Sequence, residues 1–165
     1  CRSISASNEI SHTEPHRQQW IIINAFAHLL EILPDPNFRL GRFKNEVGSI
    51  AADKAGLNVA ILLVELLYLF QAQDYHTLID RAESIEKYTR RYLRGKHPRE
   101  NAILNMLLAL VQENFDPAAA EMRITEKGYR KDLEVCSLIE DSEIVPYERI
   151  WEVATLKVSQ KRRVV

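Results

Sequence analysis

The chain has few of the residues that mark disulfide-rich, metal-binding or nucleotide-binding proteins. Only two of its 165 residues are cysteine, which is too few for a disulfide framework and is typical of reduced thiols in a cytosolic protein. Its five histidines form no HxH pair, and neither cysteine has a CxxC partner, so we expect no metal site. Its five glycines form neither a GxGxxG motif nor a P-loop, so we expect no cofactor.

An excess of either charge is also missing, and so is a membrane-length apolar run. The 22 basic and 23 acidic residues give a net charge of −1, so no global field draws the protein to nucleic acid or to a membrane. The longest apolar run, residues 56–70, is shorter than the roughly 18–20 residues of a transmembrane span and contains Glu65. The first fifteen residues are polar and lack the apolar centre of a signal peptide. We therefore expect a cytoplasmic protein that has no membrane partner.

The start of the sequence suggests that the chain is part of a longer protein, because it begins with Cys1 rather than methionine. We expect residues 1–15 to be disordered or the beginning of a fragment. We expect residues 16–165 to form a single helical-repeat domain, since this length suffices for one core or a few stacked repeats.

Residues 56–72, GLNVAILLVELLYLFQA, are apolar on nearly every side of a helix and carry one charge, Glu65. A surface helix has a polar face, and this segment has none, so other helices must cover it all round. This pattern predicts an all-α protein of layered helices. Proline, glycine and capping residues divide the chain into further helices, predicted at 16–33, 36–53, 57–73, 75–94, 99–112, 117–127 and 147–158. Residues 129–140 fit a short strand or a helix equally well.

The predicted helices fall into three pairs, and the second helix of each pair follows an aspartate. Asp35, Asp74 and Asp116 are about forty residues apart, and two of them precede a proline, which is favoured at the first helical position. An internal period of about forty residues is typical of helical solenoids. Gly41 and Gly48 share one face of the predicted helix 36–53, where each costs about 1 kcal/mol relative to alanine, so we expect a neighbouring helix to approach them closely.

The middle pair resembles a tetratricopeptide repeat. Residues 66–70, LLYLF, followed by Gln71-Ala72-Gln73-Asp74-Tyr75, are similar to that family's end of the first helix, polar turn and tyrosine opening the second helix. The positions that match the family's apolar or small residues are Leu62, Leu66, Leu69, Tyr75, Leu78, Ala82 and Ile85. The chain departs from the family in having units near forty residues rather than thirty-four, and in having leucine at 66 and 78, where the family has small residues. The resemblance covers about residues 20–127.

The resemblance implies a right-handed solenoid of antiparallel helical hairpins and a role in presenting a groove to protein partners. From the chain's own residues we expect a C-terminal helix to close the solenoid, and we expect a non-catalytic protein–protein interaction or scaffold module. The first helices of such pairs line a concave face, and the apolar residues expected there are Phe26, Leu30, Leu63, Leu67, Phe70, Ile103 and Leu107. A face of this size needs cover. Either a protein or peptide partner fills the groove, or the chain's own C-terminal helix fills it through Trp151, which is the alternative we favour.

A second functional hypothesis concerns residues 87–99, KYTRRYLRGKHPR, which contain two tyrosines and no acidic residue. The basic residues of this stretch are Lys87, Arg90, Arg91, Arg94, Lys96 and Arg99. Interleaved cations and aromatic rings are compatible with a regulator that binds nucleic acid or another polyanion. Lysine and arginine are also favoured at a helix C-terminus because they complement its dipole, which is the simpler interpretation.

A third hypothesis is an enzyme that uses the buried carboxylate of Glu65, because buried acidic groups can have a raised pKa and do chemistry. The simpler interpretation is that Glu65 pairs with a basic residue. No nucleophile elbow, metal motif or phosphate-binding loop accompanies it. We therefore expect no catalytic residues and no enzymatic activity.

Overall fold

The computed structural model describes residues 14–48, 56–134 and 143–162. Every regular element in these ranges is a helix, which confirms the all-α expectation. The elements are α1 (Glu14–Leu29), α2 (Leu40–Val47), α3 (Gly56–Ala72), α4 (Tyr75–Tyr88), η1 (Thr89–Leu93), α5 (Pro98–Gln112), α6 (Pro117–Lys127), α7 (Tyr129–Glu134) and α8 (Tyr147–Arg162). The expectation for residues 1–13 lies outside the described residues.

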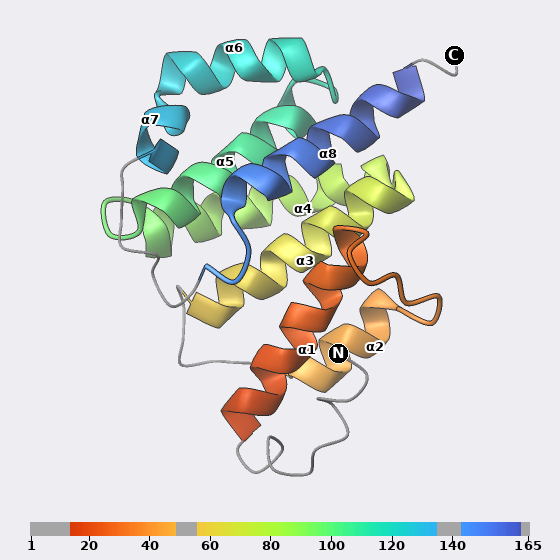
Figure 1. Ribbon diagram of the computed structural model, residues 1–165. Coiled ribbons are helices and arrows are strands. Elements are labelled where there is room, and N and C mark those ends of the chain that lie inside the picture. Colours follow the sequence, from red (N-terminus) through yellow and green to blue (C-terminus); the bar gives the residue numbers. More distant parts are fainter. Residues whose placement is uncertain (1–13, 49–55, 135–142, 163–165) are drawn as a thin grey trace.

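The helix α3 lies in the middle of the fold, as its all-round apolar sequence predicts (Figure 1). It contacts α1, α2, α4, α5 and α8, and its leucine and valine side chains are largely buried. Helix α5 has a similar position, because α4, α6, α7 and α8 all pack against it. The core therefore forms around two neighbouring helices that other helices cover.

Two of the three expected aspartate caps begin helices. The Asp74 side chain accepts hydrogen bonds from the backbone N–H of Thr77 (3.1 Å) and from its hydroxyl (2.7 Å). The Asp116 side chain accepts from the N–H groups of Ala118 (2.9 Å) and Ala119 (3.2 Å). These bonds satisfy N–H groups that have no partner within the helix, which places the starts of α4 and α6 where the sequence predicts them.

The third aspartate, Asp35, does not cap a helix, so the predicted start of the second helix is wrong. Its side chain accepts from the N–H of Asn37 (2.9 Å) and closes an Asx turn, while its own N–H donates to His28 Nδ1 (2.8 Å). Helix α2 begins only at Leu40, after Arg39, which makes no side-chain capping bond. The Asp35 carboxylate therefore accepts its hydrogen bond within a local turn and is not used to cap α2.

The expected close approach at the two glycines is also wrong. A Cβ atom added at Gly41 or Gly48 would meet no neighbouring atom within 4 Å. Gly48 instead ends α2 with a φ of 65°, a positive-φ conformation that glycine adopts without steric cost. The sequence of residues 129–140 fits a strand or a helix equally well. In the structure its first part, residues 129–134, forms the helix α7. The remainder of that segment lies outside the described residues.

The same sharp turn follows α1, α3 and α5. The positive-φ residues other than glycine in the described ranges are Glu31, Gln73, Asn114 and Phe115, and all follow the ends of these three helices. A left-handed conformation costs a residue with a side chain roughly 1–2 kcal/mol. These turns lie about forty residues apart along the chain.

Helix α4 continues into one turn of π-helix, η1, which lies within the predicted helix 75–94. The Arg94 N–H donates to the Thr89 carbonyl (3.0 Å), five residues earlier, and the Thr89 hydroxyl donates to the Glu86 carbonyl (2.9 Å). Thr89 and Leu93 are buried, whereas Arg90 is exposed. The π turn therefore fixes which side chains point to the core and which point to solvent. Such turns are frequent at functional sites.

Candidate functional site

The residues predicted to line an inner groove all lie in the interior of this structure. They come from α1 and its C-terminal end, α3, α5 and α8, and each is 6% exposed or less: Phe26, Leu30, Leu63, Leu67, Phe70, Ile103, Leu107 and Trp151. These side chains therefore form packed core rather than an open groove lined with apolar surface.

Helix α8 covers the face formed by α3 and α5, which we call the inner face. It packs against both α3 and α5, and Figure 1 shows the blue helix running alongside the green and yellow ones. The side chains that α8 buries are Tyr147, Ile150, Trp151, Val153, Ala154 and Val158. The sequence allowed either a partner or the chain's own C-terminal helix to cover this face. In the structure the C-terminal helix packs there.

An ion cluster fixes the beginning of α8. The Arg99 side chain of α5 donates to both carboxylate oxygens of Glu143 (2.9 and 2.8 Å) and to Glu148 (3.3 Å), and also to the Leu133 carbonyl. These contacts, the Glu143 hydrogen bond above all, raise the pKa of Arg99 above its usual range. Glu143 also accepts from the N–H of Tyr147 at 3.2 Å. Arg99 is therefore engaged in holding α8 and does not add to an exposed basic surface.

A second ion pair lies towards the other end of α8. Lys157 donates to the carboxylate of Glu31, which follows α1, at 2.6 Å. This hydrogen bond lowers the pKa of Glu31 below its ordinary value of 4.5. The contact joins residues 126 positions apart in the sequence, so it connects the first helical pair directly to the C-terminal helix.

Glu65 is the centre of a buried ion cluster. Its Oε1 atom accepts from Lys44 Nζ of α2 (2.7 Å), and its Oε2 atom accepts from the Arg81 guanidinium of α4 (2.9 Å). The Glu65 side chain is 7% exposed, while the Lys44 and Arg81 side chains are 43% and 38% exposed. Both oxygens are thus engaged by cations that keep contact with water. The pairing connects three helices, in keeping with the simpler interpretation of this residue.

The remaining basic residues of 87–99 lie at the outer end of α4 and just beyond it. Lys87 pairs with Glu83 (2.6 Å) and lowers the pKa of that carboxyl group. The other four cations are exposed and form no ion pair with any residue of the described ranges: Arg90, Arg91, Arg94 and Lys96. In the basic stretch, therefore, Lys87 and Arg99 form ion pairs, and the other four cations are exposed to solvent.

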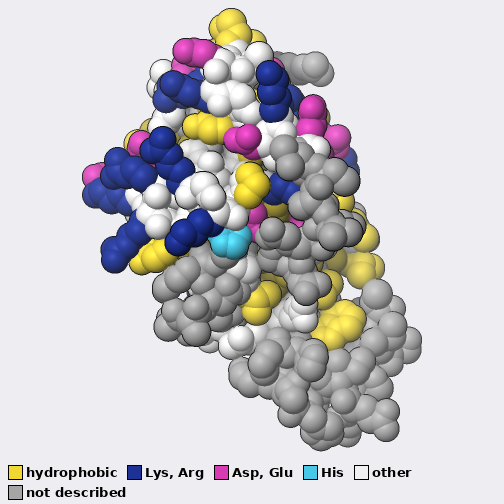
Figure 2. Space-filling view, turned by 90° about the vertical axis from the view of Figure 1, so that its left-hand side faces the viewer, with side chains coloured by type: hydrophobic (Ala, Val, Ile, Leu, Met, Phe, Trp, Pro, Cys, Tyr) yellow, Lys and Arg dark blue, Asp and Glu magenta, His cyan; other side chains and the backbone are white. Residues whose placement is uncertain are grey.

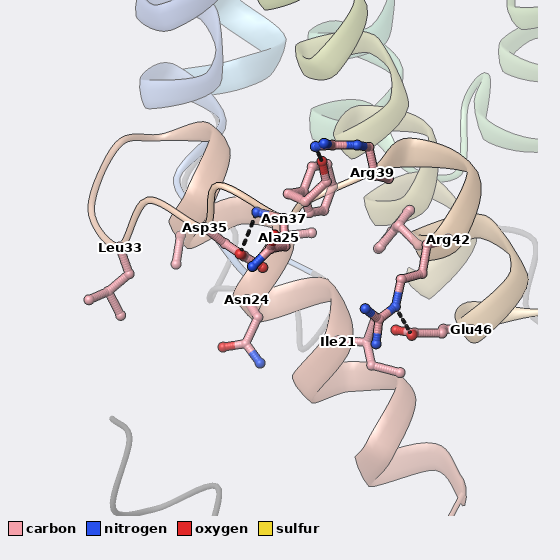
Figure 3. Close-up of a pocket in the computed structure, with 12 residues that line it drawn as sticks. Ile21, Asn24, Ala25, Leu33, Asp35, Asn37, Arg39, Arg42 and Glu46 are labelled. Carbon is pink, nitrogen blue, oxygen red and sulfur yellow. Dashed lines mark hydrogen bonds and ion pairs between the residues drawn. The ribbon is translucent and has the colours of Figure 1, made fainter.

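A cavity of about 340 Å³ lies between α1, α2 and the connection that joins them (Figure 3). Its polar side chains are largely occupied with near neighbours: Arg42 pairs with Glu46 (2.6 Å), and Arg39 donates to the Phe38 carbonyl (2.9 Å). Figure 3 shows Asn24, Arg39 and Arg42 pointing in different directions. The groups do not converge on one ligand position, so this cavity is a weak candidate for a binding site.

Within the described ranges, no group of three or more His, Cys, Asp or Glu side chains is placed to hold a metal ion. No helix in those ranges is long and apolar enough to cross a membrane. No protein-family model, curated protein or solved structure matches the chain.

Proposed function

We propose that the chain is a non-catalytic protein–protein interaction or scaffold module built of tetratricopeptide-like helical pairs. The observation that carries the proposal is the repeated turn after α1, α3 and α5, in which a residue with a side chain adopts positive φ. In the second and third pairs an aspartate cap follows this turn. Repeated pairs of this kind expose long helix surfaces, which is how helical repeat proteins bind their partners.

The surroundings of Glu65 favour a structural role for this group over a catalytic one. A general base must reach a proton on a substrate, and here each carboxylate oxygen already accepts a hydrogen bond from a cation. The two cations come from α2 and α4, and both donate to the one carboxylate of Glu65 on α3. Glu65 therefore serves to hold the first two helical pairs together.

In this proposal α8 takes the place on the inner face that a partner helix takes in an open array. It buries a tryptophan there, and ion pairs at Arg99 and Lys157 hold it in position. Partners then bind the outer surfaces of the helical pairs. Closure of the inner face also explains why the apolar residues of α3 and α5 are compatible with a stable chain.

The test is isolation of a complex and its reconstitution. The full-length protein would be captured from cells of its source, and each protein that copurifies would be expressed, purified and mixed with this chain in a calorimeter. A stoichiometric complex with one defined protein is the expected result. Absence of any reconstituted complex, together with turnover of a small-molecule substrate by the purified chain, would contradict the proposal.

A further inference from the structure

Four exposed cations, Arg90, Arg91, Arg94 and Lys96, gather where η1 turns towards α5, and we call them the basic tip. Figure 2 looks onto the side of the molecule that carries this turn and shows Lys and Arg side chains grouped on one part of it. The protein as a whole has a net charge of −1, so the basic tip is a local excess of positive charge.

The basic tip has an electrostatic cost that the helix dipole offsets only in part. Two like charges about 8 Å apart in water repel by about 0.5 kcal/mol, and four such charges in seven residues form several pairs. The helix dipole favours cations within the last turn, which accounts for Arg90 and Arg91 but not for Lys96, which lies beyond η1. Several other cations of the described ranges form ion pairs, as Arg81 and Arg99 do. The unpaired tip is therefore suited to an anionic partner.

The backbone of the basic tip is held in place before any partner binds. The π turn is anchored by the buried residues Thr89 and Leu93, and the Lys96 N–H donates to the Leu93 carbonyl at 3.0 Å. The Arg91 guanidinium lies over the Tyr92 ring, 5.3 Å from its centroid. A backbone that is fixed before binding loses less conformational entropy on binding than a flexible one.

The contacts of the tyrosines distinguish between two classes of anionic partner. Tyr88 and Tyr92 are half-buried, their ring centroids are 5.3 Å apart, and Arg91 covers Tyr92. Binding of single-stranded nucleic acid relies on aromatic faces that are free to stack on bases. The basic tip offers cations without such faces, and arginine forms strong paired hydrogen bonds with carboxylates.

We propose that the basic tip docks an acidic segment of a partner protein, whose Asp and Glu carboxylates bind the four cations. This inference rests on the proposed interaction function and specifies the chemistry of one partner surface. The site is small, about two turns of chain, so it fits a short acidic stretch rather than a long polyanion.

The test measures binding of a fluorescein-labelled decaglutamate peptide by fluorescence anisotropy at about 50 mM salt, where surface charges are weakly screened. The double variant Arg91→Glu with Arg94→Glu should bind the peptide at least tenfold more weakly than the parent. The matched control, Arg39→Glu with Arg42→Glu, makes the same charge change at exposed positions on and beside α2, and should bind within about twofold of the parent. Both variants should melt near the parent temperature, since exposed substitutions alter stability by only about 0.5 kcal/mol.

The inference is overturned if the parent does not bind the peptide, or if the control loses as much affinity as the tip variant. A ten-nucleotide uridine RNA that binds more tightly than the peptide would also overturn it, in favour of a nucleic-acid site. Failure of the proposed function is a separate result. If a reconstituted protein complex still forms after charge reversal at the tip, the docking inference is wrong and the proposed interaction function is retained. If the peptide binds but no protein complex can be reconstituted, the proposed interaction function is wrong.

Discussion

Replacing Trp151 with alanine removes the largest side chain that α8 places against the inner helices. In the folded chain Trp151 is 6% exposed, so the variant loses the packing contacts of nearly the whole side chain. Substitution of a core tryptophan by alanine costs about 3–5 kcal/mol, because the transfer free energy is lost and a cavity is left behind. Single domains have a total stability of about 5–15 kcal/mol, so this loss is a large share.

The expected change in melting temperature follows from the size of the chain. For domains of about 150–250 residues, each kilocalorie per mole shifts the melting temperature by about 2–4 °C. Trp151→Ala should therefore lower the melting temperature by about 6–20 °C, measured by circular dichroism at 222 nm. It should also increase aggregation during heating, because the inner face is less well covered.

The matched control is Leu156→Ala, on the same helix. Leu156 is 55% exposed, so its truncation should change the free energy of unfolding by about 0.5 kcal/mol or less. The reasoning is refuted if the two variants melt at the same temperature, because burial of Trp151 against α3 and α5 would then contribute nothing.

Three further predictions concern polar contacts. Arg81→Ala should lower the free energy of unfolding in urea by about 1–2 kcal/mol through the loss of a charged hydrogen bond to the buried cluster, while Lys87→Ala on the same helix should change it by less than about 0.5 kcal/mol. Asp116→Ala should cost about 1 kcal/mol because it removes a cap, and Asp35→Ala, which caps no helix, should cost less in the same urea titration. The hydrogen bond from α8 lowers the pKa of Glu31 below 4.5, so this group stabilises the fold above pH 4.5 and loses its contribution as the pH falls through the folded value. The melting temperature of Glu31→Gln should accordingly fall less between pH 5 and pH 3 than that of the parent, and an equal fall would contradict the assignment.

The positions of most helices could be predicted because their signals are local. Apolar periodicity locates α3 and α5, and the caps Asp74 and Asp116 locate the starts of α4 and α6 within a residue. The failure at Asp35 has a local cause as well, since an Asx turn and a cap begin with the same residue type. Sequence pattern alone does not distinguish the two.

The polar contacts of the candidate sites could not be predicted, because they join distant parts of the chain. Glu65 accepts from residues 21 and 16 positions away, and Arg99 donates to Glu143, 44 positions away. These partners depend on how helices are placed against each other, which periodicity does not reveal. The sequence places Arg99 in the basic stretch, although its carboxylate partners are Glu143, which precedes α8, and Glu148 of α8.

The packing of α8 on the inner face is the central feature of this fold, and a chain that ends before Pro146 tests it directly. Sedimentation velocity of the truncated and complete chains at the same concentration would measure the consequence. Removal of α8 should expose the apolar residues of α3 and α5, so that the truncated chain aggregates and its remaining soluble fraction melts at a lower temperature. A truncated chain that stays monomeric and melts at the temperature of the complete chain would contradict the account, and would indicate an inner face that is open to a peptide partner.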